Sequence, residues 1–377
     1  MNILFFLLLS VGLLFSLAYT NKNKNKNKNK NKNKNKNKNK NKNINDSIMF
    51  MLVVLMILMS GLRVNDSDYL EYNKMYNEVP SLYNFTLSAI KDIHGEIGYL
   101  FLSSFFKTFD LPFQFFLFFI ASLSLMLTYF SFKKASIIPI LSLVFYLSHA
   151  FIVRDMIQIR AGLAVSMSLY TIVTYKKNRN VIAGILLASL IHSGAIIIAI
   201  CYPFIRKRYL SLRKIFSLFL VALIFSYLHG LDFILNTLIH YNLLPDAVAN
   251  YIGWEEYDYR INIFTNPVFI KGVMIVFLMK KYIKININNE KDKVVILYNL
   301  YVLGVLAMVG LSEMAILSGR LSSFLTLGES ILIVYGLFYK RNISVGFVFF
   351  LLLTFIQMGY DLLISNVHPK LSLFIFG

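Results

Sequence analysis

Four arginines lie beside or inside long apolar runs, and they are the residues most able to do chemistry there: Arg63, Arg154, Arg160 and Arg320. An ionisable residue inside a membrane segment is costly and by default suggests a functional site. A guanidinium group binds phosphate oxygens through two parallel hydrogen bonds, so these arginines suggest a site for an anion such as a diphosphate. Arg63 and Arg154 also fit a simpler interpretation, in which an interfacial arginine snorkels within an aromatic belt.

The segment RDMIQIRAG predicts a helix that starts near Arg154 and continues to residue 175. On a continuous helix Arg154 and Gln158 share a face, whereas Arg160 points about 120° away and lies roughly 9 Å deeper. Asp155, near the helix start, would complement the helix dipole. The depth of Arg160 makes it the strongest candidate for a phosphate ligand.

Arg320 begins another predicted helix, over residues 321–339, which also contains Glu329. Nine residues of helix would separate the two by about 13 Å and place them on opposite faces. They are therefore not expected to pair with each other, and each needs its own partner.

His192 and Ser193 interrupt the apolar run LLASLIHSGAIII. A neutral imidazole can act as a general base toward a hydroxyl group, although a buried histidine that only packs is an equally good interpretation. One helix over 181–205 would also carry the next basic cluster, residues 206–214, to the outside, against the positive-inside rule. We therefore expect a helix break at residues 191–194, lining a polar cavity.

Tyrosines follow Arg63, and the segment YIGWEEYDY mixes the single tryptophan with acids. This composition is typical of surfaces that contact carbohydrate, and equally of an aromatic belt. The candidate sugar-contacting residues are Tyr69, Tyr72, Trp254 and Glu255.

Composition places these residues in a membrane protein. The chain has 377 residues, of which 57% are hydrophobic and 15% charged, with a mean hydropathy of +0.62. Soluble domains carry about 25% charged residues, and the recurring apolar runs are long enough to cross ~30 Å of hydrocarbon. The net charge of +19 includes eleven Asn-Lys pairs at residues 21–42 and falls to +8 without them. The basic residues outside this tract lie in short loops and are not interleaved with aromatic residues. This pattern excludes a nucleic-acid-binding protein.

The predicted organisation is an all-α, polytopic bundle of about 10–12 transmembrane segments. Residues 1–20 form a first membrane helix, residues 21–45 a disordered Asn-Lys loop on the cytoplasmic side, and residues 46–377 the membrane domain. Two loops with an excess of acids, near 63–96 and 244–266, are expected outside, and the segment 97–109 is short for a span. In this topology all four arginines lie at or just below the external surface, where something must compensate their charge.

No cofactor or metal is expected from local motifs. Cys201 is the single cysteine, so there is no disulfide framework. The triplet Asp66-Ser67-Asp68 superficially matches the metal-binding DxD motif of nucleotide-sugar transferases. In the predicted topology it lies on the external side of the membrane, where nucleotide sugars are absent. The chain has no phosphate-loop, HExxH or Gly-x-Ser-x-Gly motif, so nothing favours ATP-driven transport or zinc or serine hydrolysis.

Five segments in order resemble the EpsG family of exopolysaccharide proteins, which is related to the Wzy-type O-antigen and capsule polymerases. They are GLR followed by DSDYLEY, EIGYLFLSSFF, QIRAGLAVSMSLY, LIHSGAIIIA and SGRLSSFLTLGES. The resemblance covers most of the chain, from about Gly61 to Glu329. The sequence departs from the family pattern at Ala161, where the family often has Gln, and in the Asn-Lys tract.

The resemblance implies a GT-C-like helical fold in the bacterial cytoplasmic membrane that polymerises undecaprenyl-pyrophosphate-linked repeat units on the outer face. Arg160 and Arg63 would hold the pyrophosphate, with Arg320 as a second phosphate ligand. The base that deprotonates the acceptor hydroxyl would be His192 or a carboxylate, Asp68 or Glu96. Expected partners are the lipid-linked glycans, the bilayer, and a chain-length regulator and flippase of the same pathway.

Two other functions remain open at this point. A flippase for lipid-linked oligosaccharides would be expected to show internal repeats and charges through both leaflets, and the sequence has no clear repeat. A membrane acyltransferase that modifies polysaccharide fits His192, but no second His/Asp motif accompanies it.

Overall fold

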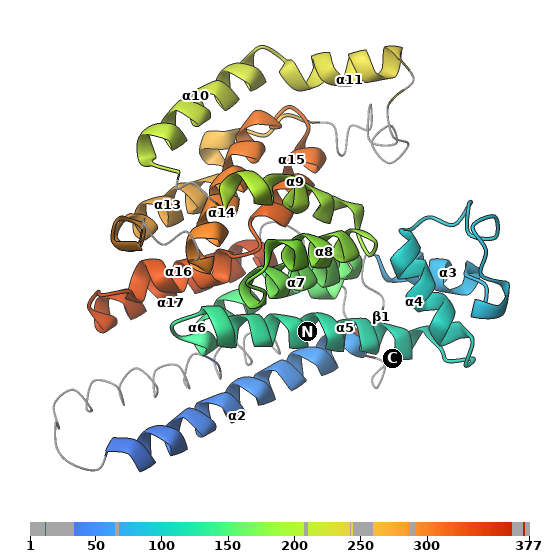
Figure 1. Ribbon diagram of the computed structural model, residues 1–377, viewed down its shortest axis with the longest axis horizontal. Helices are drawn as coiled ribbons and strands as arrows, with labels where there is room; N and C mark the ends of the chain where they lie inside the picture. The colour runs from blue at the N-terminus through green and yellow to red at the C-terminus, as the bar shows by residue number, and fades with distance from the viewer. Residues whose placement is uncertain are drawn as a thin grey trace. The chain divides into compact units, whose positions relative to one another are not determined.

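The computed structural model describes residues 12, 34–64, 68–206, 210–241, 243, 259–286, 292–363 and 372–373 (Figure 1). The chain divides into two compact units. Unit 1 comprises Met1–Ala195 with Leu337–Gly377, and unit 2 comprises Ile196–Gly336. Within the described ranges both units are built almost entirely of helices, as the sequence predicted.

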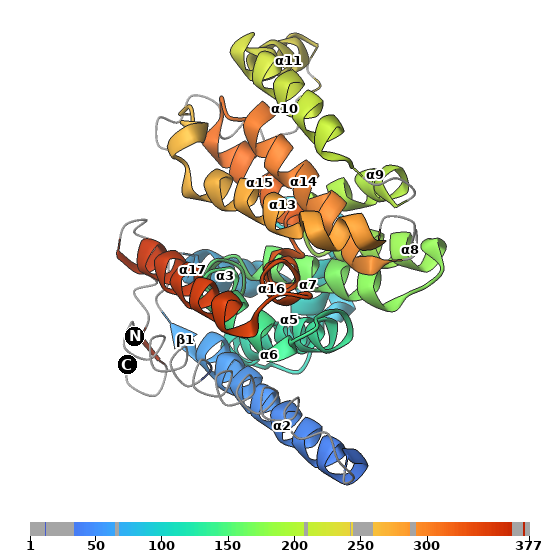
Figure 2. The same cartoon turned by 90° about the vertical axis from the view of Figure 1, so that its left-hand side faces the viewer.

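Unit 1 is assembled around α5, which packs against both α2 and α7. Figure 1 shows α2 running beside α5, and Figure 2 gives the view turned by 90°. A short antiparallel pair joins β1 (Arg63–Val64) to β2 (Ser372–Leu373), with Arg63 opposite Leu373. The helices of the unit are α2 (Lys34–Gly61), α3 (Tyr69–Glu78), α4 (Ile97–Lys107), α5 (Phe113–Ala135), α6 (Pro139–Leu147), α7 (Ile159–Thr174), α8 (Asn178–Ser189) and α17 (Ile343–Leu363), with single turns η1 (Leu82–Asn84), η2 (Phe151–Ile157) and η3 (Ser193–Ala195).

Unit 2 is centred on α14, which packs against α9, α10, α13 and α15. Its elements are α9 (Ile196–Ile205), α10 (Leu212–Tyr227), α11 (Gly230–His240), η4 (Ile263–Thr265), α13 (Pro267–Asn286), α14 (Lys293–Gly310), α15 (Ala315–Leu325) and α16 (Glu329–Phe338), whose last two residues belong to unit 1. Of the predicted external loop 244–266, only residues 259–266 are among those described.

Three described helices are long and apolar enough to cross a membrane: α5, α14 and α17. Three bent pairs, α6 with η2, α10 with α11 and α15 with α16, raise the number to six if each pair is one span, and four shorter apolar helices accompany them. α17 exposes large apolar side chains such as Phe349 at 54% and Ile356 at 66%. An apolar helix that exposes such side chains suits lipid contact, so the predicted class, a polytopic helical membrane protein, is confirmed.

Two local predictions on the short segments are confirmed. The run from 181 to 205 is broken: α8 ends at Ser189, and the turn at 190–195 precedes α9. The short segment predicted at 97–109 is the 11-residue helix α4.

α2 begins at Lys34, within the tract predicted as a loop over 21–45. Two predicted helices need correction. The helix predicted from Arg154 is interrupted at Gln158, where φ is −92° and ψ 62°. The helix predicted over 321–339 is two helices, α15 and α16, bent by 63° at the turn that contains Gly328.

The break at Gln158 changes the geometry expected for the neighbouring polar residues. Arg154 and Asp155 belong to the π-helical turn η2, and Arg160 is the second residue of α7. The three side chains therefore do not follow the spacing of one helix. Gly162 allows the turn to pack closely, because a Cβ there would meet the Arg154 carbonyl oxygen at 2.5 Å.

Candidate functional site

The carboxylate of Glu96 joins three separate segments of unit 1. Arg160 Nη1, on the first turn of α7, donates to Glu96 Oε2 at 2.8 Å. The backbone N–H and the hydroxyl of Ser193, in the break between α8 and α9, donate to Glu96 Oε1 at 2.9 and 3.1 Å. Glu96 itself immediately precedes α4. Residues far apart in sequence thus meet at one carboxylate, which we call the Glu96 cluster: Tyr72, Glu96, Tyr99, Arg160, His192 and Ser193.

The helix break supplies the backbone groups of this cluster. Gly98 N donates to the carbonyl of Leu190 at 2.8 Å, so the start of α4 is docked on the broken segment. A Cβ at Gly98 would lie 2.7 Å from the same oxygen, which explains glycine at this contact. Gly194 N donates to His192 Nδ1 at 3.1 Å, and His192 Nδ1 lies 3.6 Å from Glu96 Oε1. Non-helical backbone here therefore orients both the histidine and the carboxylate.

Two tyrosine rings flank the Arg160 guanidinium. Its central carbon lies 5.7 Å from the ring centroid of Tyr72 and 5.8 Å from that of Tyr99. Such cation–π contacts contribute about 0.5–2 kcal/mol each. Tyr72, which was predicted to contact sugar, is 6% exposed, and its ring contacts the Arg160 guanidinium.

Two polar atoms of the cluster are buried and have no hydrogen-bond partner among the described residues: Arg160 Nε and Tyr99 Oη. Buried polar groups are nearly always hydrogen-bonded, and an exception requires an explanation such as a water, an ion or a catalytic role. The Arg160 side chain is 14% exposed. A small polar group of a ligand is therefore the kind of partner that could hydrogen-bond to Arg160 Nε and Tyr99 Oη.

Gly95 permits the backbone turn that delivers Glu96. Its φ is +152°, in a region that side chains rarely adopt, and a Cβ would meet Leu100 and Met75 at 3.1 Å and Arg160 Nη1 at 3.5 Å. Backbone held in such a region clusters at functional sites. Sequence reasoning missed this glycine and Tyr99.

The electrostatics of the cluster favour an ionised Glu96. Burial acts to raise the pKa of its carboxyl, but the positive charge of Arg160 and the neighbouring His192 and Ser193 N–H outweigh it and hold the pKa below its ordinary value of 4.5. Burial raises the pKa of the Tyr72 phenol despite Arg160. The cluster at neutral pH thus pairs a carboxylate with a guanidinium between neutral phenols.

Arg63 belongs to a second, fully buried network. Its side chain has 0% exposure, and Nη1 donates to the carbonyl of Ser60 at 2.6 Å. Asp155, 2% exposed, accepts from Ser124 Oγ at 2.5 Å and from Tyr146 Oη at 2.6 Å, while its backbone oxygen accepts from Ser60 Oγ at 2.5 Å. Arg63, predicted as a phosphate clamp, thus lies inside a packed network, and its role in binding phosphate stays a prediction.

The structure brings together four of the predicted site residues, Glu96, Arg160, His192 and Tyr72, and places the others elsewhere. Asp68 precedes α3 and is half-buried, and Tyr69 donates to Gln114 Oε1 at 3.2 Å. Gln158 and Arg154 are half-buried at the break before α7. Arg320 is exposed on α15, in unit 2, and Trp254 and Glu255 lie outside the described residues.

The expectation that Arg320 and Glu329 each need a separate partner is confirmed for Glu329. Its Oε1 lies 2.7 Å from Lys271 Nζ, so this pair joins α13 to the start of α16. Sequence reasoning did not identify Lys271. It also missed the contact of His149 Nδ1 with Asp361 Oδ2 at 2.7 Å in unit 1.

The fold and this site define a multi-pass helical membrane protein with an arginine–carboxylate cluster at a broken helix. The model of the EpsG family matches residues 47–375, and the chain belongs to the EpsG family. It is 25% identical over 328 residues to the amylovoran biosynthesis protein AmsC of Erwinia amylovora, covering 83% of this chain and 84% of that protein. No solved structure matches the chain.

Proposed function

We propose that this protein is a polysaccharide polymerase that joins undecaprenyl-pyrophosphate-linked oligosaccharide units on the outer face of the bacterial cytoplasmic membrane. Membership of the EpsG family supports this proposal, as does the similarity to a protein named for the biosynthesis of amylovoran. The observation that carries it is the arrangement of Arg160. One terminal nitrogen is held by Glu96, while the buried Nε has no partner in the described part of the chain.

In this proposal Arg160 binds the diphosphate of the lipid carrier. A guanidinium binds phosphate side-on through Nε and one terminal nitrogen, and Glu96 occupies Nη1, which does not belong to that edge. When the glycosidic bond to the carrier breaks, negative charge develops on the diphosphate. A fixed guanidinium stabilises that charge without a nucleotide, and such groups typically contribute factors of about 10²–10³ in rate.

Glu96 acts in this mechanism as a positioning residue. Both of its oxygens already accept hydrogen bonds, and its lowered pKa makes it a weak base. A general base works best when its pKa lies near the operating pH. The base that accepts the proton of the acceptor hydroxyl is then His192. Its Nδ1 accepts from Gly194 N–H, and a neutral imidazole has one acceptor nitrogen, so this hydrogen bond must give way when Nδ1 takes the proton. Asp68 remains an alternative base at the start of α3.

The remaining predicted residues would take supporting roles. Arg320, exposed on α15, stays a candidate second phosphate ligand. Arg154 and Gln158 flank the break that sets the direction of Arg160, and Tyr69, Trp254 and Glu255 stay candidates for sugar contacts. Arg63, inside its packed network, stays a candidate for binding phosphate.

The test is complementation of a deletion strain, with the glycan profile and the lipid-linked intermediates measured. Arg160→Ala should abolish polymer while leaving the amount of membrane-inserted protein unchanged, and Arg160→Lys should restore little, because lysine lacks the planar fork. Arg179→Ala is the matched control: like Arg160 it is the second residue of its helix, and it is exposed. Full-length polymer from Arg160→Ala would refute the role of this residue.

The same strains separate polymerase from flippase. A strain without a polymerase should display single repeat units on the lipid carrier outside the membrane, whereas a strain without a flippase should accumulate them inside. Mapping of an introduced cysteine next to Arg160 with membrane-impermeant reagents adds a second condition. Labelling from the cytoplasmic side only would contradict the outer-face mechanism.

A further inference from the structure

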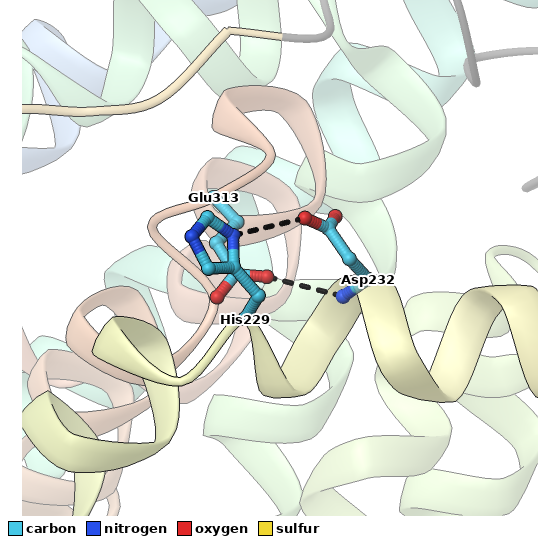
Figure 3. A group of neighbouring side chains, drawn as sticks. All are labelled: His229, Asp232 and Glu313. Atoms are coloured by element: carbon cyan, nitrogen blue, oxygen red, sulfur yellow. Dashed lines mark hydrogen bonds and ion pairs between the residues drawn. The ribbon is translucent and has the colours of Figure 1, made fainter.

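Three potential metal ligands from two segments of unit 2 face one another: His229, Asp232 and Glu313 (Figure 3). One donor atom from each lies within 4.8 Å of the other two. His229 lies at the corner between α10 and α11, Asp232 in the first turn of α11, and Glu313 in the turn between α14 and α15. We infer that these three side chains form a binding site for a divalent transition-metal ion such as Zn²⁺ or Mn²⁺.

Glu313 gives the strongest reason to look for a ligand here. The residue is only 8% exposed, and its Oε1 is buried with no hydrogen-bond partner among the described residues. Its Oε2 accepts from Asp232 N at 3.1 Å, so the carboxylate is fixed toward the other two side chains. An ionised carboxylate with an unused buried oxygen is unfavourable unless it is paired or coordinates a metal. A cation supplies that partner if both oxygens of Glu313 bind it, and we take this two-oxygen binding as part of the inference.

The spacing of the donors is close to that of a coordination sphere. His229 Nδ1 lies 3.2 Å from Asp232 Oδ2. Two ligands bound to one Zn²⁺ at about 2.0–2.2 Å in tetrahedral geometry are separated by roughly 3.3 Å. His229 Nδ1 and Asp232 Oδ2 are thus already at the distance that two zinc ligands require. The Glu313 oxygen lies within 4.8 Å of both, so it has to move by roughly 1.5 Å at most.

The donor set selects the kind of ion. Carboxylate oxygens alone suit Mg²⁺, Ca²⁺ and Mn²⁺, whereas an imidazole nitrogen favours Zn²⁺ and other transition metals. The side chains of His229 and Asp232 are 63% and 55% exposed, so an ion from solvent can reach the site and retain solvent ligands. Three protein ligands with open positions are the arrangement of a site that can also bind a substrate oxygen.

Hydrogen bonds next to the three residues hold the two segments together without the ion. Ser226 Oγ and Ser312 Oγ lie 2.8 Å apart and join the end of α10 to the turn that holds Glu313. Arg260 Nη2 donates to the carbonyl of Ser226 at 3.1 Å, and these three residues line a cavity of about 500 Å³ with Tyr227 and Phe264. His229 itself has a φ of 55°, a left-handed conformation that histidine adopts more often than most residues.

The simpler interpretation is a hydrogen bond between His229 and Asp232 beside the start of α11, with no ion. It accounts for the exposed pair, since a helix N-terminus attracts carboxylates. It does not account for Glu313 Oε1, which the helix start leaves unsatisfied. The two interpretations differ in a measurable quantity, the stoichiometry of bound metal.

The experiment measures metal binding to the full-length protein, purified in detergent with a tag that contains no histidine and stripped with a chelator. Zn²⁺ is added, the excess is removed, and bound zinc is measured by elemental analysis. Co²⁺ absorption bands report the coordination geometry, and Mg²⁺ serves as competitor. We expect about one equivalent of Zn²⁺ for the wild-type protein and an affinity loss of about tenfold or more in His229→Ala and Glu313→Gln, because loss of even an outer partner of a ligand costs 10–100-fold.

His240→Ala is the matched control, because it removes an exposed histidine from the same helix. Glu313→Gln keeps an oxygen that can accept from Asp232 N–H, and His229→Ala changes an exposed side chain, so at least one variant retains the fold. Equal zinc content in the wild type, His229→Ala and His240→Ala would overturn the proposal, as would a wild type that binds none. The readout is independent of polymerisation, so this result and the proposed function can fail separately.

Discussion

Two close ion pairs, one in each unit, have nearly the same geometry and different surroundings. Arg160 Nη1 lies 2.8 Å from Glu96 Oε2, with side-chain exposures of 14% and 20%. Lys271 Nζ lies 2.7 Å from Glu329 Oε1, with exposures of 9% and 16%. Neither distance nor burial distinguishes them, so the difference in role has to come from what surrounds each pair.

The backbone next to the two pairs differs. Glu329 is the first residue of α16, where a carboxylate is stabilised by the helix dipole, and Lys271 lies on the regular helix α13. Glu96 lies in extended backbone and its second donor, Ser193, begins the 3-10 turn η3. The Arg160 guanidinium has an unpartnered Nε within the described structure. A helix break adjoins both pairs, since Glu329 follows the bend at Gly328. The comparison teaches that unsatisfied polar atoms, rather than the ion pair or the break, identify a candidate site.

The largest expected effect separates the pairs by activity. Glu96→Gln removes the charge that holds Arg160, and a displacement of about 1 Å of a positioned group can reduce the rate about 10²-fold. Glu329→Gln should leave polymer formation per folded molecule unchanged. The measurement is polymer yield normalised to inserted protein in a complemented deletion strain, with the exposed Glu71→Gln on α3 as control. Equal losses in Glu96→Gln and Glu329→Gln would remove the distinction.

The second prediction separates the pairs by stability. Lys271→Met leaves the mostly buried Glu329 carboxylate without this partner, which typically costs about 3–5 kcal/mol. The exposed Lys280→Met on the same helix should cost much less. Replacement of both partners, Lys271→Met with Glu329→Leu, should recover most of the loss, because paired apolar residues are often neutral.

Thermal unfolding of the purified protein in detergent measures this effect. The double variant provides the control for unspecific damage to α13 or α16. A double variant less stable than Lys271→Met would show that the pair is not the cause of the loss.

The sequence was most informative where a local pattern carries the structure. The segment Ile191-His192-Ser193-Gly194 predicted the break that now holds Ser193 against Glu96, and the position of Arg160 in an apolar segment marked it as functional. Gly328 also carried a signal, since glycine is typical of helix ends, and it lies at the bend between α15 and α16. That signal was overlooked.

Other features have no local signal. Nothing in QIRAG indicates that the helix is interrupted at Gln158, because the segment contains no proline and its glycine lies after the break. The contact of Glu96 with Arg160 spans 64 residues, and that of Asp232 with Glu313 spans 81. A search for short motifs therefore led to the expectation of no metal site, since the three donors meet only in the folded chain.

The smallest expected effect concerns pH and sharpens the description of the Glu96 pair. Because Arg160 and His192 outweigh burial, the folded-state pKa of Glu96 lies below its ordinary value of 4.5. The folded state then binds fewer protons than the unfolded state, so this stabilisation is fully present above about pH 4.5 and is lost as the pH falls through the lowered pKa. The melting temperature of the wild type should therefore exceed that of Glu96→Gln near neutral pH, and the difference should shrink in acid. Glu71→Gln should show no such convergence, and a difference between wild type and Glu96→Gln that stays constant with pH would contradict the assigned charge state.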